Sequence, residues 1–188
     1  MAAVGTARSA VAAAVSMGIG DLACQQLLVG SSSHADSLDA RRAAIFSVTG
    51  LICSGPAGHA VFTLLETLVP GSSAGAALRK VLLDTVIAPA RIAMTFGTHQ
   101  LLSGNGIDGA AAKVREDTLP TFAAGVCIFP WIIFGVYRKV PLGWRATVMA
   151  PVGALWNIYL SWAAHSGANT GHAPPHHQIQ RRLTERTS

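Results

Sequence analysis

Residues 43–68 read AAIFSVTGLICSGPAGHAVFTLLETL, an apolar stretch whose only charged side chain is Glu66, near its end. The hydrocarbon core of a bilayer is about 30 Å thick, and a helix needs about 20 residues to cross it. Residues 10–28, 81–102, 119–136 and 146–164 have the same apolar character. Because backbone groups in lipid must find partners within the protein, these stretches predict an all-α fold, a polytopic transmembrane bundle of four to five spans.

The overall composition agrees with this fold class. Hydrophobic residues make up 51% of the 188 positions and charged residues 12%, whereas a soluble domain carries roughly 25% charge. The Lys and Arg side chains are scattered in ones and twos, without a basic face or interleaved aromatic residues. The net charge of +5 therefore does not indicate nucleic acid as a partner, and the expected surroundings are the lipid bilayer.

Turn-rich sequence separates the predicted spans. Residues 30–39, Pro70-Gly71 and residues 103–106 read as loops, and residues 110–117 predict a short polar interfacial helix before the fourth span. Pro120 and Pro130 interrupt that fourth span, which leaves four or five crossings open. Lys and Arg fall about equally on the two sides, so the orientation stays open.

We expect one transmembrane domain, residues 1–165, followed by a polar, basic tail, residues 166–188. The tail has no apolar periodicity with which to build a core of its own. Its predicted role is contact with other membrane subunits.

Three charged residues fall in the middle of predicted spans: Asp21, Asp84 and Arg91. Each costs about 2.5–3.5 kcal/mol at a helix centre on insertion scales. The favoured interpretation is an ion-pair lock, in which Asp21 or Asp84 pairs with Arg91, or with Arg42 or Lys80 near a membrane surface. The alternative is a water-lined pathway that uses the same charges.

Small residues at i+4 spacing are typical of helix contacts in membranes, although an Ala- and Gly-rich chain also produces such ladders by chance. Three such ladders are present: Ala12, Ser16, Gly20 and Cys24; Gly50, Ser54 and Gly58; and Gly153, Asn157 and Ser161. The aromatic residues near the end of the chain favour an interfacial anchor and a packing face over a cofactor site; they are Trp144, Trp156, Tyr159 and Trp162.

No motif for catalysis is present. The chain has no Gly-rich phosphate loop, no nucleophile elbow and no HExxH, and the cluster of His172, His176 and His177 does not fix a tetrahedral site. We predict no enzymatic activity, no catalytic residues, no metal and no cofactor, with a bound lipid such as cardiolipin as the one exception left open.

Particular residues resemble a known family over about residues 18–165. They are Gly20-Asp21 with Gln25-Gln26, Gly55-Pro56, Pro130, and the run Trp156-Asn157-Ile158-Tyr159-Leu160-Ser161-Trp162. This pattern is similar to the Mpv-seventeen / peroxisomal membrane protein twenty-two family of small multi-span proteins. The resemblance implies the mitochondrial inner membrane, or alternatively the peroxisomal membrane, and channel-like behaviour linked to metabolite pools.

The chain departs from this family in the fourth span. The family pattern there is Trp-Pro-x-x-Gln-x-x-Asn-Phe, and the matching positions here are Phe129, Pro130, Ile133, Val136 and Tyr137. Two amides that could line a path are lost. The sequence therefore favours an accessory or structural subunit of a large mitochondrial inner-membrane complex, of respiratory or ATP-synthase type, with a channel for small metabolites or ions as the alternative.

Overall fold

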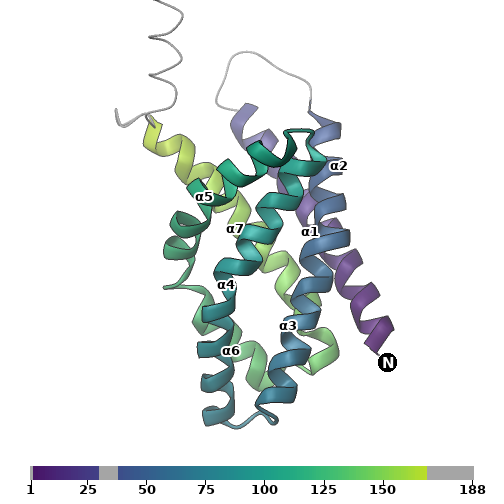
Figure 1. Ribbon diagram of the computed structural model, residues 1–188, viewed down its shortest axis with the longest axis vertical. Helices are drawn as coiled ribbons and strands as arrows, with labels where there is room; N and C mark the ends of the chain where they lie inside the picture. Colours follow the sequence, from purple (N-terminus) through teal and green to yellow (C-terminus); the bar gives the residue numbers. More distant parts are fainter. Residues whose placement is uncertain (1, 30–37, 169–188) are drawn as a thin grey trace, which may run out of the picture.

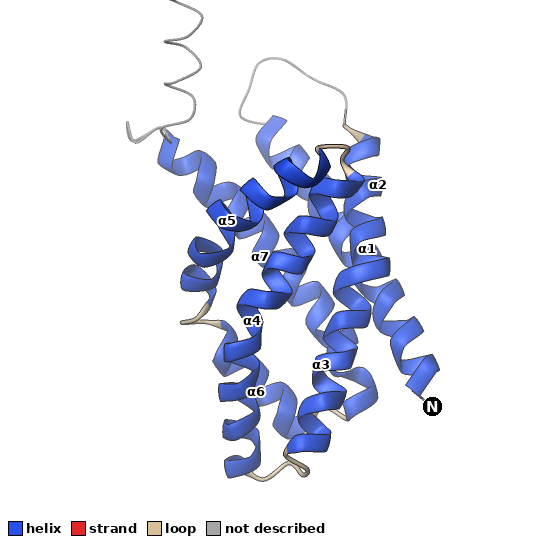
Figure 2. Ribbon diagram, in the orientation of Figure 1, coloured by secondary structure: helices blue, strands red, loops and turns tan. Residues whose placement is uncertain are grey.

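The computed structural model describes residues 2–29 and 38–168, and this part of the chain is helical without strands (Figures 1 and 2). Three long helices are α1 (Ala2–Val29), α4 (Ala74–Leu102) and α7 (Leu142–Ala168). A further rod consists of α2 (Ala40–Thr49), the π-helical turn η1 (Gly50–Ser54) and α3 (Gly55–Leu68), joined end to end. The remaining helices are α5 (Gly106–Gly125) and α6 (Phe129–Lys139).

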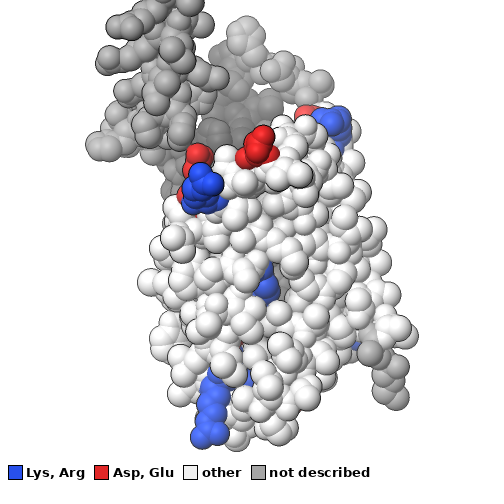
Figure 3. All heavy atoms as spheres, viewed as in Figure 1, with Lys and Arg blue, Asp and Glu red and all other residues white. Residues whose placement is uncertain are grey.

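Among the described residues, three helical stretches are long and apolar enough to cross a membrane: Ala3–Gln26, Ala40–Leu68 and Ala74–Leu102. A fourth span is added if α5 and α6, which meet at 67°, together make one crossing. The predicted all-α membrane bundle is confirmed. Figure 3 shows that the face of the bundle between its two charged ends is almost free of charged side chains. Large apolar side chains are exposed on the bundle, such as Val86 and Trp131 at 78% each, as expected of residues that face lipid.

The predicted separate interfacial helix at residues 110–117 is wrong. These residues are the first part of α5, which continues through Pro120 to Gly125. The chain breaks instead at residues 126–128, just before Pro130 in the first turn of α6. Proline fits a first helical turn, where its missing N–H would lack a partner anyway, and it disfavours helical geometry in the residue before it.

The π-helical turn changes which glycines face α1. The N–H of Gly55 bonds to the carbonyl of Gly50, five residues back, beside Pro56, whose ring crowds the carbonyl four residues earlier. Gly50 and Gly55 therefore both meet α1: a Cβ on Gly50 would lie 2.6 Å from the Ala13 carbonyl oxygen, and one on Gly55 would lie 2.5 Å from the Ala10 Cα.

The i+4 ladders are correct only in part. A Cβ on Gly58 would touch Ala146 at 3.8 Å, and a Cβ on Gly153 would meet no atom within 4 Å. Gly20, on the predicted ladder of α1, does meet α7: a Cβ there would lie 3.2 Å from the Cβ of Ala154. In the π-helical turn, the residues that face α1 are therefore five positions apart, Gly50 and Gly55, and not four.

A hydrophobic core fills the end of the bundle where α3 and α6 end and α4 and α7 begin (Figure 1). The rings of Phe62 and Tyr137 meet edge to face, with centroids 5.5 Å apart. Tyr137 is fully buried. The other buried members are Leu65, Ala77, Val81, Ile133, Val136 and Ala146.

Candidate functional site: an ion pair in a central cavity

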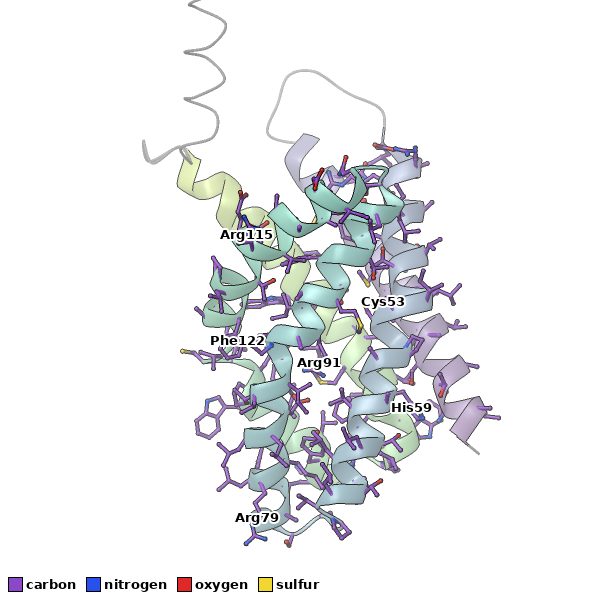
Figure 4. All side chains as sticks on the ribbon, in the orientation of Figure 1. Cys53, His59, Arg79, Arg91, Arg115 and Phe122 are labelled. Carbon is purple, nitrogen blue, oxygen red and sulfur yellow. The ribbon has the colours of Figure 1, made fainter. Side chains whose placement is uncertain are left out.

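A cavity of about 320 Å³ lies inside the bundle. Its walls come from α1, η1 and every helix from α3 to α7, so it is a feature of the whole fold. Among the described residues that line it, only Asp84 and Arg91 are charged. In Figure 4, Arg91 lies about midway along the bundle between α3 and α4, with Phe122 on the side of α5.

Asp84 and Arg91 form an ion pair along one face of α4, on either side of Pro89. The Arg91 guanidinium donates to Asp84 Oδ2 at 3.3 Å. Asp84 is 1% exposed, and its other oxygen, Oδ1, has no hydrogen-bond partner among the described residues. Buried carboxylate oxygens are almost always hydrogen-bonded, so Oδ1 is an unusual acceptor, buried beside the cavity without a partner in the described part of the chain.

The rest of the wall combines hydroxyl groups with aromatic rings. Ser54 and Thr95 share a hydrogen bond of 3.2 Å across the gap between η1 and α4, and Thr85 bonds back to the Val81 carbonyl. On another side, Phe129 and Trp156 pack edge to face at 5.2 Å. The cavity therefore offers a charged, hydroxyl-bearing side and an apolar side to whatever enters it.

Asp21 lies away from this cavity, in a clamp between α1 and the start of α2. Its Oδ1 lies 2.9 Å from the Arg42 guanidinium, and its Oδ2 accepts from Gln25 Nε2 at 2.7 Å. The Gln25 amide also bonds both backbone groups of Asp39, accepting from its N–H at 2.7 Å and donating to its C=O at 3.1 Å. The Gly-Asp-x-x-x-Gln start thus ties Asp39, the N-cap residue of α2, to α1.

Replacing Gln25 with alanine should destabilise the bundle by about 1–3 kcal/mol, because Oδ2 of the buried Asp21 carboxylate and the N–H of Asp39 each lose their hydrogen bond to the Gln25 amide. The matched control is Gln26→Ala, since Gln26 is exposed. Denaturant unfolding of both variants in a mild detergent measures the difference. Equal unfolding free energies for the two variants would contradict the clamp.

The sequence did not reveal a second charged cluster, where three helices meet at one end of the bundle. Glu66 Oε2 on α3 accepts from Lys80 Nζ at 2.6 Å and from Arg145 on α7 at 2.5 Å. Glu66 Oε1 accepts from the Gly71 N–H, and Lys80 also donates to the Gly71 carbonyl. The one available signal was Glu66 itself, a lone carboxylate inside a membrane-length stretch.

The other predicted residues fall into three groups. Gly20 and Gly55 are helix contacts, as described above. Gly55, Pro130 and Trp156 line the cavity, while Pro56 begins α3 beside it. The side chains of Asn157, Tyr159, Ser161 and Trp162, and the tail from residue 169, lie outside the described residues.

The sequence is related to proteins of known location. The model of the Mpv17 / PMP22 family matches residues 100–161. The mitochondrial inner membrane protein Mpv17 of Danio rerio is 31% identical over 152 residues, which cover 79% of this chain and 84% of the relative. This chain belongs to the Mpv17 / PMP22 family.

Other members of the Mpv17 / PMP22 family match less closely. Human mitochondrial inner membrane protein Mpv17 is 29% identical over 154 residues, covering 79% of this chain and 84% of its own length. Peroxisomal membrane protein 2 of Bos taurus is 25% identical over 117 residues, covering 62% of this chain and 60% of its own. No solved structure matches the chain.

These sequence similarities confirm the predicted family. They also confirm the predicted location in the mitochondrial inner membrane, with the peroxisomal membrane as the alternative. This family member is an integral membrane protein whose surroundings are the lipid bilayer. The names of the relatives contain no enzymatic activity.

The departures in the fourth span face the interior of the bundle. Ile133 and Val136 are both buried on α6, and Ile133 lines the cavity beside Phe129. The amides of the family pattern would therefore point inward at these positions. This family member has a less polar cavity wall than that pattern gives.

Proposed function

We propose that this member of the Mpv17 / PMP22 family is a channel-type protein that lets small metabolites or ions cross the mitochondrial inner or peroxisomal membrane. The observation that supports it is the cavity of about 320 Å³, with Asp84 and Arg91 in its wall. Small-molecule sites typically enclose about 300–1,000 Å³. Charged residues within membrane spans usually face the bundle interior or a water-filled space, where they mark solute pathways.

The geometry of the pair suits a transient solute site. The Arg91 side chain is 27% exposed, and the Asp84 carboxylate keeps one oxygen unbonded by the protein. A polar solute can reach the Arg91 guanidinium, whose one hydrogen bond to Asp84 is long at 3.3 Å, without first breaking a network of protein hydrogen bonds. Weak binding at such a site is what conduction requires, because a solute that enters must also leave.

The apolar side of the cavity would restrict passage. Phe122, Phe129 and Ile133 form part of the wall, and narrow hydrophobic constrictions close pores to water and ions by dewetting. We therefore propose a low-conductance, selective pathway in place of a wide pore.

Planar bilayers containing the purified protein test this proposal. We expect Asp84→Asn to shift permeability toward anions and Arg91→Gln to shift it toward cations, each by about tenfold, which corresponds to about 1.4 kcal/mol. Each variant leaves one charge of the pair in the wall, so the two shifts have opposite signs.

The control is Lys113→Gln, which removes an exposed positive charge outside the cavity and should leave the selectivity unchanged. No conductance from the folded wild-type protein, or a shift of the same sign in both cavity variants, would sink the proposal.

An accessory subunit of a larger mitochondrial inner-membrane complex is the second candidate. It is favoured by Ile133 and Val136, which replace the family's amides with side chains that pack helices. From residue 169 onward, the tail predicted to contact other subunits lies outside the described residues. Gentle solubilisation of native membranes separates the two roles, because a subunit would migrate with a large complex and not near its own mass of 19.5 kDa.

A further inference from the structure

We propose that the basic surface formed by Arg79, Arg138 and Lys139 binds the headgroup of an anionic phospholipid. This surface is separate from the cavity, since none of its three residues lines the cavity. The inference therefore does not depend on the proposed channel function.

The described charges are distributed unequally between the two ends of the bundle. The end that holds the start of α4, the end of α6 and the start of α7 has one acidic residue, Glu66, and six basic residues: Arg8, Arg79, Lys80, Arg138, Lys139 and Arg145. The opposite end has acidic and basic residues in nearly equal number, five and four: Asp21, Asp39, Asp108, Glu116, Asp117, and Arg41, Arg42, Lys113, Arg115. Figure 3 shows only basic colour at the first end and both colours at the second, and Figure 4 labels Arg79 and Arg115 at these ends.

The single carboxylate at the basic end is already occupied. Glu66 Oε2 accepts from both Lys80 and Arg145, and Oε1 accepts from the Gly71 N–H. Arg79, Arg138 and Lys139 are exposed, and no carboxylate of the described chain lies within ion-pair distance of them. Their counterions must come from outside the described part of the chain.

A buried contact between α4 and α6 places the three cations at the same end of the bundle. The Nζ of Lys80, the neighbour of Arg79, lies 5.5 Å from the ring centroid of Tyr137, the neighbour of Arg138. Lys80 and Tyr137 are both fully buried, so the backbone on either side of this contact is fixed. A ligand with two phosphate charges could be reached from both helices.

The surface next to these cations is apolar, which distinguishes a lipid from a free anion. Leu78, Leu82 and Val86 follow at i+4 spacing along the exposed face of α4 toward mid-span. On α6, Trp131 is 78% exposed and precedes Arg138 by seven residues, which places both on one face. A phospholipid fits both the basic and the apolar residues of this surface, with its phosphate at the cations and its acyl chains along the apolar side chains. With three cations present, a lipid with two phosphates, of the cardiolipin type, matches the charge best.

Native mass spectrometry of the full-length protein in detergent, with added lipid, tests the inference. The probes are tetraoleoyl cardiolipin, dioleoyl phosphatidylglycerol and dioleoyl phosphatidylcholine, with inorganic phosphate as a competitor. We expect the wild-type protein to retain cardiolipin in preference to phosphatidylcholine, and inorganic phosphate at equal concentration not to displace it.

The decisive variant is the triple change Arg79→Gln, Arg138→Gln and Lys139→Gln, which should weaken cardiolipin retention at least tenfold. The matched control removes three cations from the opposite end, Arg41→Gln, Lys113→Gln and Arg115→Gln, and should retain the lipid as the wild type does. Equal retention by the two triple variants, equal retention of phosphatidylcholine by the wild type, or displacement by inorganic phosphate would each overturn the inference.

Circular dichroism checks that the triple variant folds. If it does not, the single variants Arg79→Gln and Arg138→Gln carry the test, together with the salt dependence of the wild type. Cardiolipin retention should then fall in each single variant and as salt is raised, because a surface charge contact is screened. Retention that changes in none of these measurements overturns the inference.

Discussion

Replacing Glu66 with glutamine should destabilise the bundle by about 3–5 kcal/mol. The Lys80 side chain is fully buried and Arg145 is 4% exposed, and Glu66 is the carboxylate that binds both. Removing one partner of a buried ion pair leaves an uncompensated charge in a medium that solvates it poorly, and this variant would leave two. The expected result is a large fall in the midpoint of thermal or denaturant unfolding, or failure to accumulate as a folded protein.

The control for Glu66→Gln is Asp108→Asn, the same chemical change at an exposed carboxylate in the first turn of α5. It should cost about 0.3–1 kcal/mol through the helix dipole alone. Unfolding midpoints that agree for the two variants would show that the Glu66 cluster does not hold α3, α4 and α7 together.

Gly55→Ala should also destabilise the bundle strongly, by about 1–3 kcal/mol or more, as overpacking does. The added Cβ would lie 2.5 Å from the Cα of Ala10 and 2.6 Å from the carbonyl oxygen of Ser9. Both atoms belong to the backbone of α1, which cannot rotate away as a flexible side chain would. The helices would have to separate, and the contact between α1 and the π-helical turn would weaken.

Gly135→Ala on α6 is the matched control, because a Cβ there meets no atom within 4 Å. In a helix interior, alanine is favoured over glycine by about 0.8–1.0 kcal/mol, so this variant should gain stability. Denaturant unfolding in one detergent compares the two. If both variants changed the free energy of unfolding in the same direction, the close approach of α1 at Gly55 would not explain the effect of Gly55→Ala.

The sequence was sufficient for the class of fold because the decisive signals are local. Membrane-length apolar stretches, such as residues 43–68, require helices wherever lipid excludes water. The proline and glycine positions marked most helix ends correctly, with the exception of the fourth span. There the 119–136 prediction divided the helices at the wrong place, since Pro120 is tolerated within α5 while the break precedes Pro130.

The candidate site was foreseen only as a set of residues. Asp84 and Arg91 were singled out as costly charges, but hydropathy cannot tell whether such charges lock helices or line a cavity. That distinction depends on where six other elements place their side chains around α4. The clamp of Gln25 on Asp39 was likewise visible as a motif, without its mechanism.

The sequence by itself determined that this protein is a helical membrane protein of the Mpv17 / PMP22 family, because hydropathy and motif spacing are properties of neighbouring residues. The tertiary structure alone decided which residues meet. Glu66 binds Arg145 across 79 positions of the chain, and the π-helical turn places Gly55, where i+4 spacing had selected Ser54, against α1. Such contacts depend on how rigid helices pack together. A local pattern of residues does not show which distant part of the chain a side chain will meet.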